Sequence, residues 1–494
     1  MGKWLGIASA TGLIVGTVIQ IFLKLFFPLQ AFVFTQFWHN PHLILLLPPI
    51  GALAVGLLLH NRWTKEAHGW GPGMDVTIEE IHGQKLGYSH PLAAPVKFLA
   101  QLIGIGMGNS GGLVGASGRI GQGVAHWMGK LLHLKGREKD PSKLDMQSLA
   151  TMAVAAGLAA TIRLPLGAGL FAIEIIYGNR LYQGDVDRED IVYAEWAGVS
   201  GAITSIVVFG NQPFFGLVKV NPEFWQYPLF ALLGFLAGLV SLAFIKYYRL
   251  VLRFFHYPSL PKFIKPFIAS IIISLLSFLV LSCTKGMFDT SKEGGLFFSF
   301  APHSAYRKDL SPNKDGANSP EAPNSPLYAT PTWLGFGADN VNMAKNAWAV
   351  DSNGDGRYDQ VSIDINGGRF SIPILWTILI LLALTLGKIV ANSTYVGSGA
   401  SGGMVMPSII IGAGFGGAFA LTCVYLGILS PSYVAAYVAV GGVSVLAAVT
   451  NAPLACAIFS LELFGIGFLG PAMMATMIAY ATTEFETIYE QISA

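Results

Sequence analysis

The stretch Arg163-Leu-Pro-Leu-Gly-Ala-Gly-Leu-Phe-Ala-Ile-Glu174 has a counterpart later in the same chain. That counterpart is Asn451-Ala-Pro-Leu-Ala-Cys-Ala-Ile-Phe-Ser-Leu-Glu462, which begins 288 residues further on. Both stretches have a Pro-Leu pair, and in both a glutamate stands nine residues after the proline. A shared order of proline, small residues and glutamate at a fixed separation predicts an internal repeat.

A second pair of motifs is rich in glycine. The stretch Gly111-Gly-Leu-Val-Gly-Ala-Ser-Gly-Arg-Ile-Gly-Gln-Gly123 has six glycines in thirteen positions. The same shift of 288 residues places Gly115–Arg119 on Gly403–Pro407, which follows another glycine-rich segment, Gly397–Gly402. Such glycines bring backbone N–H groups close to a neighbour, and a helix that starts there can bind an anion. Close packing of helices through small residues is the alternative interpretation.

The composition identifies a membrane protein. Of 494 residues, 53% are hydrophobic and 12% are charged, whereas soluble domains have about 25% charged residues. The net charge of +2 gives no reason to expect a nucleic-acid partner. Cys283, Cys423 and Cys456 are scattered and predict neither a disulfide framework nor a cysteine metal site. No cleavable signal peptide is expected, because the first apolar run, Trp4 to Val33, is too long.

Long and short apolar segments alternate along the chain. Short segments broken by glycine or proline, at matching places in two halves, are typical of discontinuous helices around a transport site. We therefore expect an all-α polytopic membrane protein with inverted repeats and re-entrant helices. Residues 1–284 would hold the first repeat and the start of the second, and 371–494 the remainder. The long runs are 4–33, 43–60, 92–107, 188–209, 224–250, 263–283, 371–392, 403–427 and 468–483; the short ones are 74–83, 118–132, 148–160, 164–177, 433–449 and 453–465.

Positive charge predicts the orientation. Lysine and arginine gather in some connections and are nearly absent from others, and the positive connections of membrane proteins face the cytoplasm. We expect a multi-pass protein of the cell (inner or plasma) membrane, with both termini in the cytoplasm and residues 285–370 outside. The positive groups are Arg62 and Lys65, Lys130 to Lys143, and Lys246 to Lys265; the connections 28–42, 209–223 and 426–432 carry only Lys219.

The polar insertion 285–370 contains a calcium-loop-like motif. In Asp351-Ser-Asn-Gly-Asp-Gly-Arg-Tyr-Asp359, oxygen side chains stand at Asp351, Asn353, Asp355 and Asp359, with a glycine at position 6. This is the first part of an EF-hand loop, although Ser362 stands where its last acid is usual. The motif predicts Ca²⁺ in the 351–362 loop, and no other cofactor is expected. The alternating residues on either side instead favour a simple turn between two strands.

At these motifs the sequence resembles the CLC family of chloride channels and proton-coupled chloride transporters. The paired helices Ala159–Glu174 and Ala447–Glu462, the segment Pro95–Phe98 with its lysine, and Gly402-Gly-Met-Val-Met-Pro407 are all similar to family segments. The resemblance covers nearly the whole chain apart from 285–370. It implies a CLC-like inverted-repeat fold and a homodimer in the lipid membrane. Each subunit would have one pathway for inorganic anions.

The resemblance also implies which residues meet the anion. Backbone amides at helix starts would bind it, Lys97 would raise the positive potential, and Tyr489 would form an inner gate. The expected anion-binding residues are Gly73, Met74, Gly115, Ser117, Gly118, Arg119, Gly403, Met404, Val405 and Tyr489.

Departures from the family pattern decide the expected activity. The family's GREGP segment has a glutamate that is the outer gate and proton carrier, and here Ser117 replaces it, while Arg119 replaces the proline. Ile175 stands where transporter members often have a second acid, Gly71–Asp75 lacks the serine of GSGIP, and Val405 replaces a phenylalanine. The missing acids favour a passive anion channel or uniporter uncoupled from protons, with chloride or a similar monovalent anion as its substrate.

Other interpretations stay open at this point. The chain could be a proton-coupled antiporter using Glu79 or Glu80, which are more simply explained as a helix-start pair facing the cytoplasm. It could also be a non-conducting, calcium-binding membrane scaffold. An enzyme is not expected, because no Ser/His/Asp set, HExxH or P-loop is present. No cytoplasmic regulatory domain is expected after the membrane region.

Several single residues also have two interpretations. The Ser117 hydroxyl either coordinates the anion or only packs, and Tyr489 is either a gate or part of a frayed terminus. Arg119 is either a pathway cation or half of an ion pair, for which Glu174 is a candidate partner. Glu174 and Glu462 cap helix ends or relay protons. Lys97 adds potential or snorkels to the interface.

Overall fold

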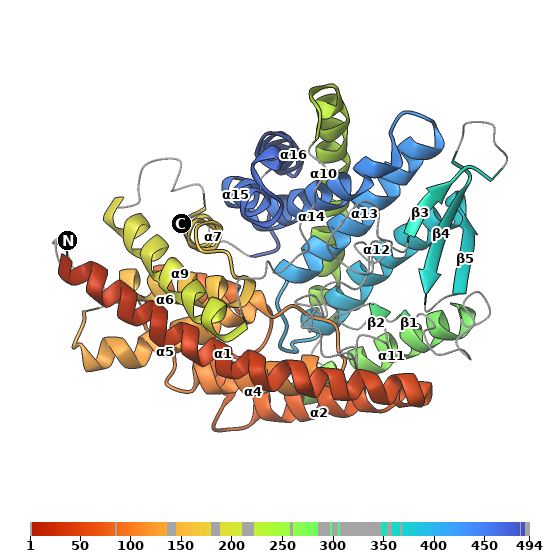
Figure 1. Cartoon of the computed structure of the whole chain (residues 1–494). Coiled ribbons are helices and arrows are strands. Elements are labelled where there is room, and N and C mark those ends of the chain that lie inside the picture. The colour runs from red at the N-terminus through yellow and green to blue at the C-terminus, as the bar shows by residue number, and fades with distance from the viewer. Residues whose placement is uncertain are drawn as a thin grey trace, which may run out of the picture.

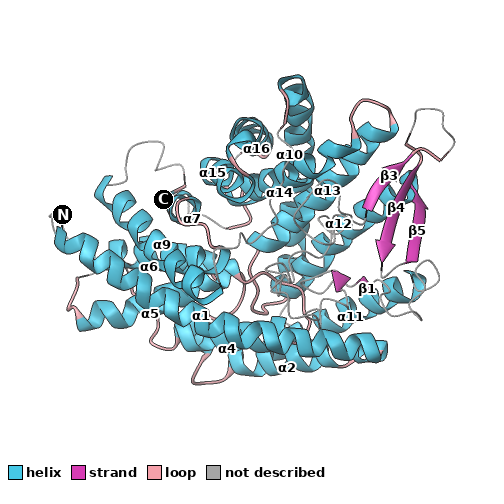
Figure 2. Cartoon of the chain, in the orientation of Figure 1, coloured by secondary structure: helices cyan, strands magenta, loops and turns pink. Residues whose placement is uncertain are grey.

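The computed structural model of the chain is a bundle of helices with a small sheet at one edge. It describes residues 2–83, 86–135, 145–178, 188–209, 222–256, 260–284, 297–298, 305–306, 347–352, 358–365, 368–484 and 486–489. In Figure 1 the first helices (red to yellow) lie at the left and below, the last helices (blue) lie above them, and the strands stand at the right edge. Figure 2 shows the strands confined to that edge, so the fold is helical apart from the insertion.

The helices differ strongly in length. Among the described residues, eight segments are long and apolar enough to cross a membrane. The helices are α1 (Gly2–His39), α2 (Leu47–His60), α3 (Met74–His82), α4 (Ala93–Gly106), α5 (Val114–Leu131), α6 (Met146–Ile162), α7 (Gly167–Tyr177), α9 (Arg188–Phe209), α10 (Tyr227–His256), α11 (Lys265–Thr284), α12 (Ile374–Gly397), α13 (Val405–Tyr425), α14 (Val434–Thr450), α15 (Pro453–Phe464) and α16 (Leu469–Thr482).

Most of the expected spans are confirmed, with three corrections. The expected spans 92–107 and 468–483 are α4 and α16, and each of these helices has only 14 residues. The segment expected to be short at 433–449 belongs to Pro431–Thr450, which has 20 residues and can cross. In addition, α5 starts at Val114 rather than at 118, because the glycines of its first turn are helical.

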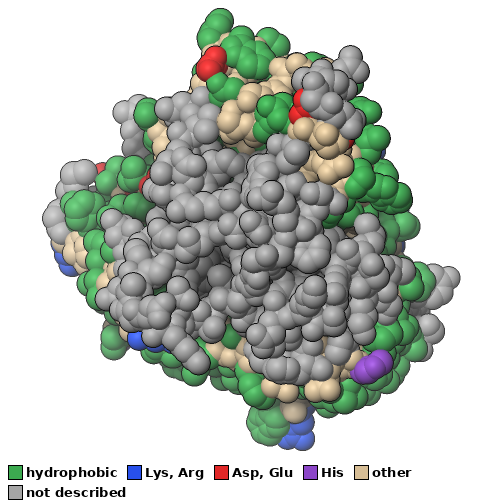
Figure 3. All heavy atoms as spheres, turned by 45° about the vertical axis from the view of Figure 1, so that its right-hand side comes forward, with side chains coloured by type: hydrophobic (Ala, Val, Ile, Leu, Met, Phe, Trp, Pro, Cys, Tyr) green, Lys and Arg blue, Asp and Glu red, His purple; other side chains and the backbone are tan. Residues whose placement is uncertain are grey.

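The outer faces of the helices suit lipid. Large apolar side chains are strongly exposed on several helices, among them Phe32 (63%), Val207 (79%) and Phe254 (71%). The space-filling view in Figure 3 shows hydrophobic side chains around the rim of the face it presents, with few charged ones. In water such a surface would aggregate, so it fits a protein surrounded by hydrocarbon.

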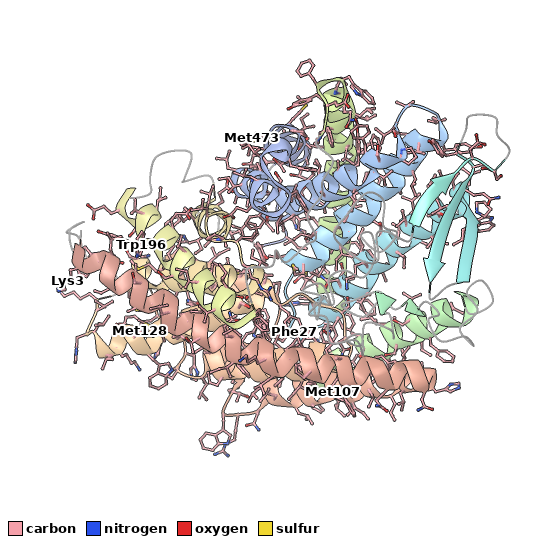
Figure 4. All side chains as sticks on the ribbon, in the orientation of Figure 1. Lys3, Phe27, Met107, Met128, Trp196 and Met473 are labelled. Atoms are coloured by element: carbon pink, nitrogen blue, oxygen red, sulfur yellow. The ribbon has the colours of Figure 1, made fainter. Side chains whose placement is uncertain are left out.

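The helices pack closely where small residues meet. A β-carbon on Gly12 of α1 would lie 2.5 Å from the Ala197 carbonyl oxygen of α9. The Trp196 indole of α9 donates to the Ser9 hydroxyl of α1 (2.7 Å) near the N-terminal end of α1, as Figure 4 shows. Every residue of α14 is buried, and so is nearly every residue of α6. These two helices start 288 residues apart and form the centres of the two halves.

The repeated glutamates bind each other's helices. The Glu462 carboxylate accepts the N–H groups of Leu166–Gly167 at the start of α7 (2.9 and 2.8 Å). The Glu174 carboxylate accepts those of Leu454–Ala455 at the start of α15 (3.2 and 2.7 Å). Donors and acceptors in the two sets are all 288 residues apart, which is the pattern of two repeats related by a two-fold axis. The prediction that these glutamates cap helix ends is confirmed.

A second set of self-equivalent contacts has a different separation, 291 residues. Gly112 and Gly403 exchange two backbone hydrogen bonds (2.8 and 2.7 Å). A β-carbon on Gly104 would lie 2.4 Å from the Tyr395 hydroxyl, and these residues are also 291 apart. The starts of α5 and α13 have the same separation. The shift of 288 therefore does not hold for the glycine-rich motifs, because the connection to the next helix is three residues shorter in the second copy.

The described part of the insertion forms a three-stranded antiparallel sheet. Strands β3 (Ala347–Val350) and β4 (Gln360–Ile365) flank the calcium-loop-like motif, and β5 (Gly368–Pro373) leads into α12. The expected hairpin is confirmed. The remaining strands, β1 (Phe297–Phe298) and β2 (Ala305–Tyr306), form a separate pair.

The proposed calcium ligands are only partly described. Asp351 and Asp359 are described, whereas Asn353 and Asp355 lie outside the described residues. The Ser352 N–H donates to Asp359 Oδ1 (2.8 Å), and the Ser352 hydroxyl donates to Oδ2. These two bonds lower the pKa of Asp359. The calcium site therefore stays a prediction.

Candidate anion-binding site

Three glycine-rich segments meet in the interior of the bundle. The Gly71 N–H donates to the Ala400 carbonyl (2.8 Å), and the Gly402 N–H donates to the Gly71 carbonyl (3.2 Å). The exchange between Gly112 and Gly403 ties the third segment to the same place. The segments before α3, α5 and α13 are thus held together by backbone bonds alone.

Three helix N-termini consequently converge. The first turns of α3, α5 and α13 have no side-chain hydrogen bond from their N-cap residues. A β-carbon on Gly115 would lie 3.4 Å from the Pro72 carbonyl oxygen, and one on Gly403 would lie 3.1 Å from the Gly115 nitrogen. Gly73 has a φ of +89°, which only glycine adopts readily. The positive ends of three helix dipoles therefore face one place, which attracts an anion.

Lys97 adds a full positive charge beside these helix starts. Its side chain is fully buried on α4, and Nζ donates to the carbonyls of Gly71 (2.8 Å) and Gly69 (3.3 Å). A β-carbon on Gly73 would lie 3.1 Å from Nζ. The alternative in which Lys97 snorkels to the interface is wrong, because none of its side chain is exposed.

The other predicted residues of these helix starts are also buried. The Met74 sulfur would lie 2.7 Å from a β-carbon on Gly118, so the starts of α3 and α5 touch. Met404 and Val405 are fully buried at the start of α13. The Asn392 amide donates to the Met404 sulfur (2.8 Å). The structure thus brings together nearly all the residues that the sequence places in the pathway.

Ser117 is fully buried in the first turn of α5. Its hydroxyl donates to the Leu113 carbonyl one turn earlier (3.1 Å). Ser408 makes the same bond to Met404 in α13 (2.8 Å), 291 residues further on. Ser117 is therefore equivalent to Ser408 and not, as the shift of 288 predicts, to Val405. Both hydroxyls satisfy their own helices and leave the first-turn N–H groups uncovered.

Arg119 belongs to a buried ion pair. Its guanidinium binds the Glu80 carboxylate of α3, with Nη2 3.3 Å from Oε1, and donates to Gln122 Oε1 (2.5 Å) and the Ala67 carbonyl (3.2 Å). The candidate partner Glu174 is wrong, because that carboxylate caps α15. Glu80 is only 3% exposed and lies in the second half of α3, so it is not part of a helix-start pair facing the cytoplasm, whereas Glu79 is exposed.

Removing one side of this ion pair should destabilise the protein strongly. Arg119→Met or Glu80→Gln leaves a buried partner uncompensated, which typically costs about 3–5 kcal/mol. The double variant Arg119→Met/Glu80→Met removes both charges and should be more stable than Arg119→Met alone. The thermal unfolding midpoint in detergent measures this. Single variants as stable as the parent would contradict a structural role for the pair.

Tyr489 is held in the interior close to the end of the chain. The Ile488 N–H and the Thr487 hydroxyl both donate to the Val449 carbonyl at the end of α14 (3.0 Å each). Tyr489 is 1% exposed, so the frayed-terminus alternative is wrong for this residue. Its hydroxyl has no hydrogen-bond partner among the described residues.

The sequence reasoning missed Lys388. This lysine of α12 is 1% exposed, donates to the Ser110 hydroxyl (3.2 Å) and lies 291 residues after Lys97. It also missed the bridge in which Gln101 donates to the Gly112 carbonyl (2.6 Å) and accepts from the Ser401 hydroxyl (3.1 Å). Aligning the two halves with a shift of 291 would have found the second lysine.

Comparisons with known proteins agree with this architecture. The family model described as voltage gated chloride channel matches residues 50–484. An uncharacterized protein of Methanocaldococcus jannaschii, MJ0305, is 24% identical over 492 residues, which is 99% of this chain and 95% of that protein. The voltage-gated ClC-type chloride channel ClcB of Yersinia pseudotuberculosis is 29% identical over 205 residues, 41% of this chain and 45% of that protein.

Solved structures have the same fold. A CLC-type fluoride/proton antiporter aligns with a TM-score of 0.68 at 17% identity and covers 99% of this chain and 97% of that chain. A slow cyanobacterial Cl⁻/H⁺ antiporter aligns with a TM-score of 0.68 at 17% identity, with coverages of 99% and 96%. Because the family model covers most of the chain, this protein belongs to the voltage-gated chloride channel (CLC) family.

Proposed function

We propose that this protein is a passive CLC-type anion channel or uniporter, uncoupled from protons, for chloride or a similar monovalent anion. It would act as a homodimer in the cell membrane with both termini in the cytoplasm. The observation that carries the proposal is the convergence of three uncapped helix starts with Lys97. Partial positive charges and one buried ammonium group attract an anion without the tight binding that would prevent its release.

The acids around the site support the absence of proton coupling. Glu80 is bound by Arg119, and Glu174 and Glu462 bind helix N-termini. A carboxylate that carries protons has to change partners, and these three have structural partners in both charge and geometry. Ser117, in the first turn of α5, cannot carry a proton at neutral pH. Asp75 is a further acid at the site.

Flux measurements in proteoliposomes test the proposal. Vesicles loaded with chloride, bromide, nitrate, fluoride or sulfate are diluted into a medium of low anion concentration, and anion efflux and internal pH are recorded together. We expect efflux of monovalent anions that collapses with the membrane potential and moves no protons. Proton uptake in a fixed ratio to anion efflux would replace the channel by an antiporter.

A third outcome would indicate a scaffold. If no anion of the panel moves but calorimetry detects Ca²⁺ binding, the non-conducting, calcium-binding interpretation of the insertion is favoured. The variant Asp351→Asn is the matched control for that titration, because it removes one carboxylate of the loop and lies far along the chain from the helix starts.

A further inference from the structure

One acid lies directly at the convergence of the helix starts. Asp75 is the second residue of α3, and its Oδ1 accepts the Gly73 N–H (3.0 Å). The positive charges of Lys97 and Arg119 act on this carboxylate from α4 and α5. The side chain is half-buried. Asp75 therefore occupies part of the positive potential that an incoming anion would use.

A second observation points to a ligand at the same place. Tyr489 lies within electrostatic reach of Asp75, and its buried hydroxyl has no hydrogen-bond partner among the described residues. A buried hydroxyl without a partner is costly, so a group that accepts its proton would stabilise the site. The phenol and the Lys97 ammonium group are donors from different elements. Together with the Gly73 amide they surround the carboxylate.

We propose that the Asp75 carboxylate is a built-in competitor for the transported anion. Both carry a negative charge, and both are stabilised by the start of α3 and by Lys97. Two like charges side by side in a site of low dielectric repel each other strongly. The anion therefore enters this part of the pathway only when the Asp75 side chain turns away, and Asp75 limits both anion affinity and flux. This inference rests on the proposed function and deepens it.

Replacing Asp75 by asparagine tests the competition. Asp75→Asn keeps the shape and an oxygen for the Gly73 N–H but removes the charge. Because like charges at a contact cost several kcal/mol, we expect anion affinity and flux to rise about tenfold or more. Chloride and fluoride binding in detergent is measured by calorimetry, and flux is measured in proteoliposomes. The thermal midpoint shows whether the variant is folded.

Two further variants make the result decisive. Asp75→Ser keeps a capping oxygen on a smaller side chain and should give the same gain if Asp75→Asn does not fold. Glu79→Gln removes an exposed acid from the same helix and should leave affinity and flux unchanged. Folded Asp75 variants with parental affinity and flux would overturn the inference and leave Asp75 as a helix cap. Tighter binding without flux in any variant would support the competition while rejecting the channel.

Discussion

Replacing Ser117 by glutamate should close the pathway at neutral pH and reopen it in acid. Ser117 lies in the first turn of α5, fully buried, where the N–H groups have no side-chain cap. A carboxylate at this position would accept those N–H groups and repel the anion. We expect flux at neutral pH to fall about tenfold or more, because like charges at one site cost several kcal/mol. Protonation removes the charge, so flux should rise as pH falls.

The matched control is Ser117→Gln. Glutamine has the size of glutamate but no titratable group, so it separates steric blocking from charge. Flux of the glutamine variant should be lowered equally at all pH values, and only the glutamate variant should recover in acid. If flux through Ser117→Glu is the same at pH 5 and pH 7.5, the Ser117 side chain lies outside the anion pathway. Anion efflux from proteoliposomes buffered at several pH values decides between these results.

The glutamate caps show how much of the fold the sequence could predict. Glu174 and Glu462 recur at one place in two similar stretches, and a buried carboxylate at the end of an apolar helix needs donors that helix starts supply. The exact equivalence of the glycine motifs could not be predicted in the same way. It depends on the length of the connection between two helices, and a change of three residues there leaves both motifs intact.

The partner of Arg119 shows where sequence reasoning ends. A buried guanidinium requires an acid, and this requirement was predicted. Several acids satisfy it, and the choice depends on how α3 and α5 are rotated against each other. That rotation follows from the contact of Met74 with Gly118 and from the close approach of Gly73 to Lys97. Such contacts join segments that are distant in sequence, so no local pattern records them.

The largest loss of function should follow from Gly403→Ala. The new β-carbon would lie 2.8 Å from the Gly112 carbonyl oxygen and 3.1 Å from the Gly115 nitrogen. Both neighbours are backbone atoms, and Gly112 and Gly403 hold each other by two hydrogen bonds. The helix starts must therefore separate, which moves their N–H groups away from a common anion. We expect anion flux to fall below detection, with a destabilisation of about 1–3 kcal/mol from overpacking.

The internal symmetry supplies the second arm of this test. Gly112 is the repeat equivalent of Gly403, and a β-carbon on it would lie 2.8 Å from Pro407 Cδ and 3.0 Å from the Gly403 carbonyl oxygen. Gly112→Ala should therefore abolish flux as Gly403→Ala does. Gly6→Ala is the control, because a β-carbon there meets no atom within 4 Å. If a folded Gly403→Ala protein still conducts like the parent, the anion does not pass between the starts of α5 and α13.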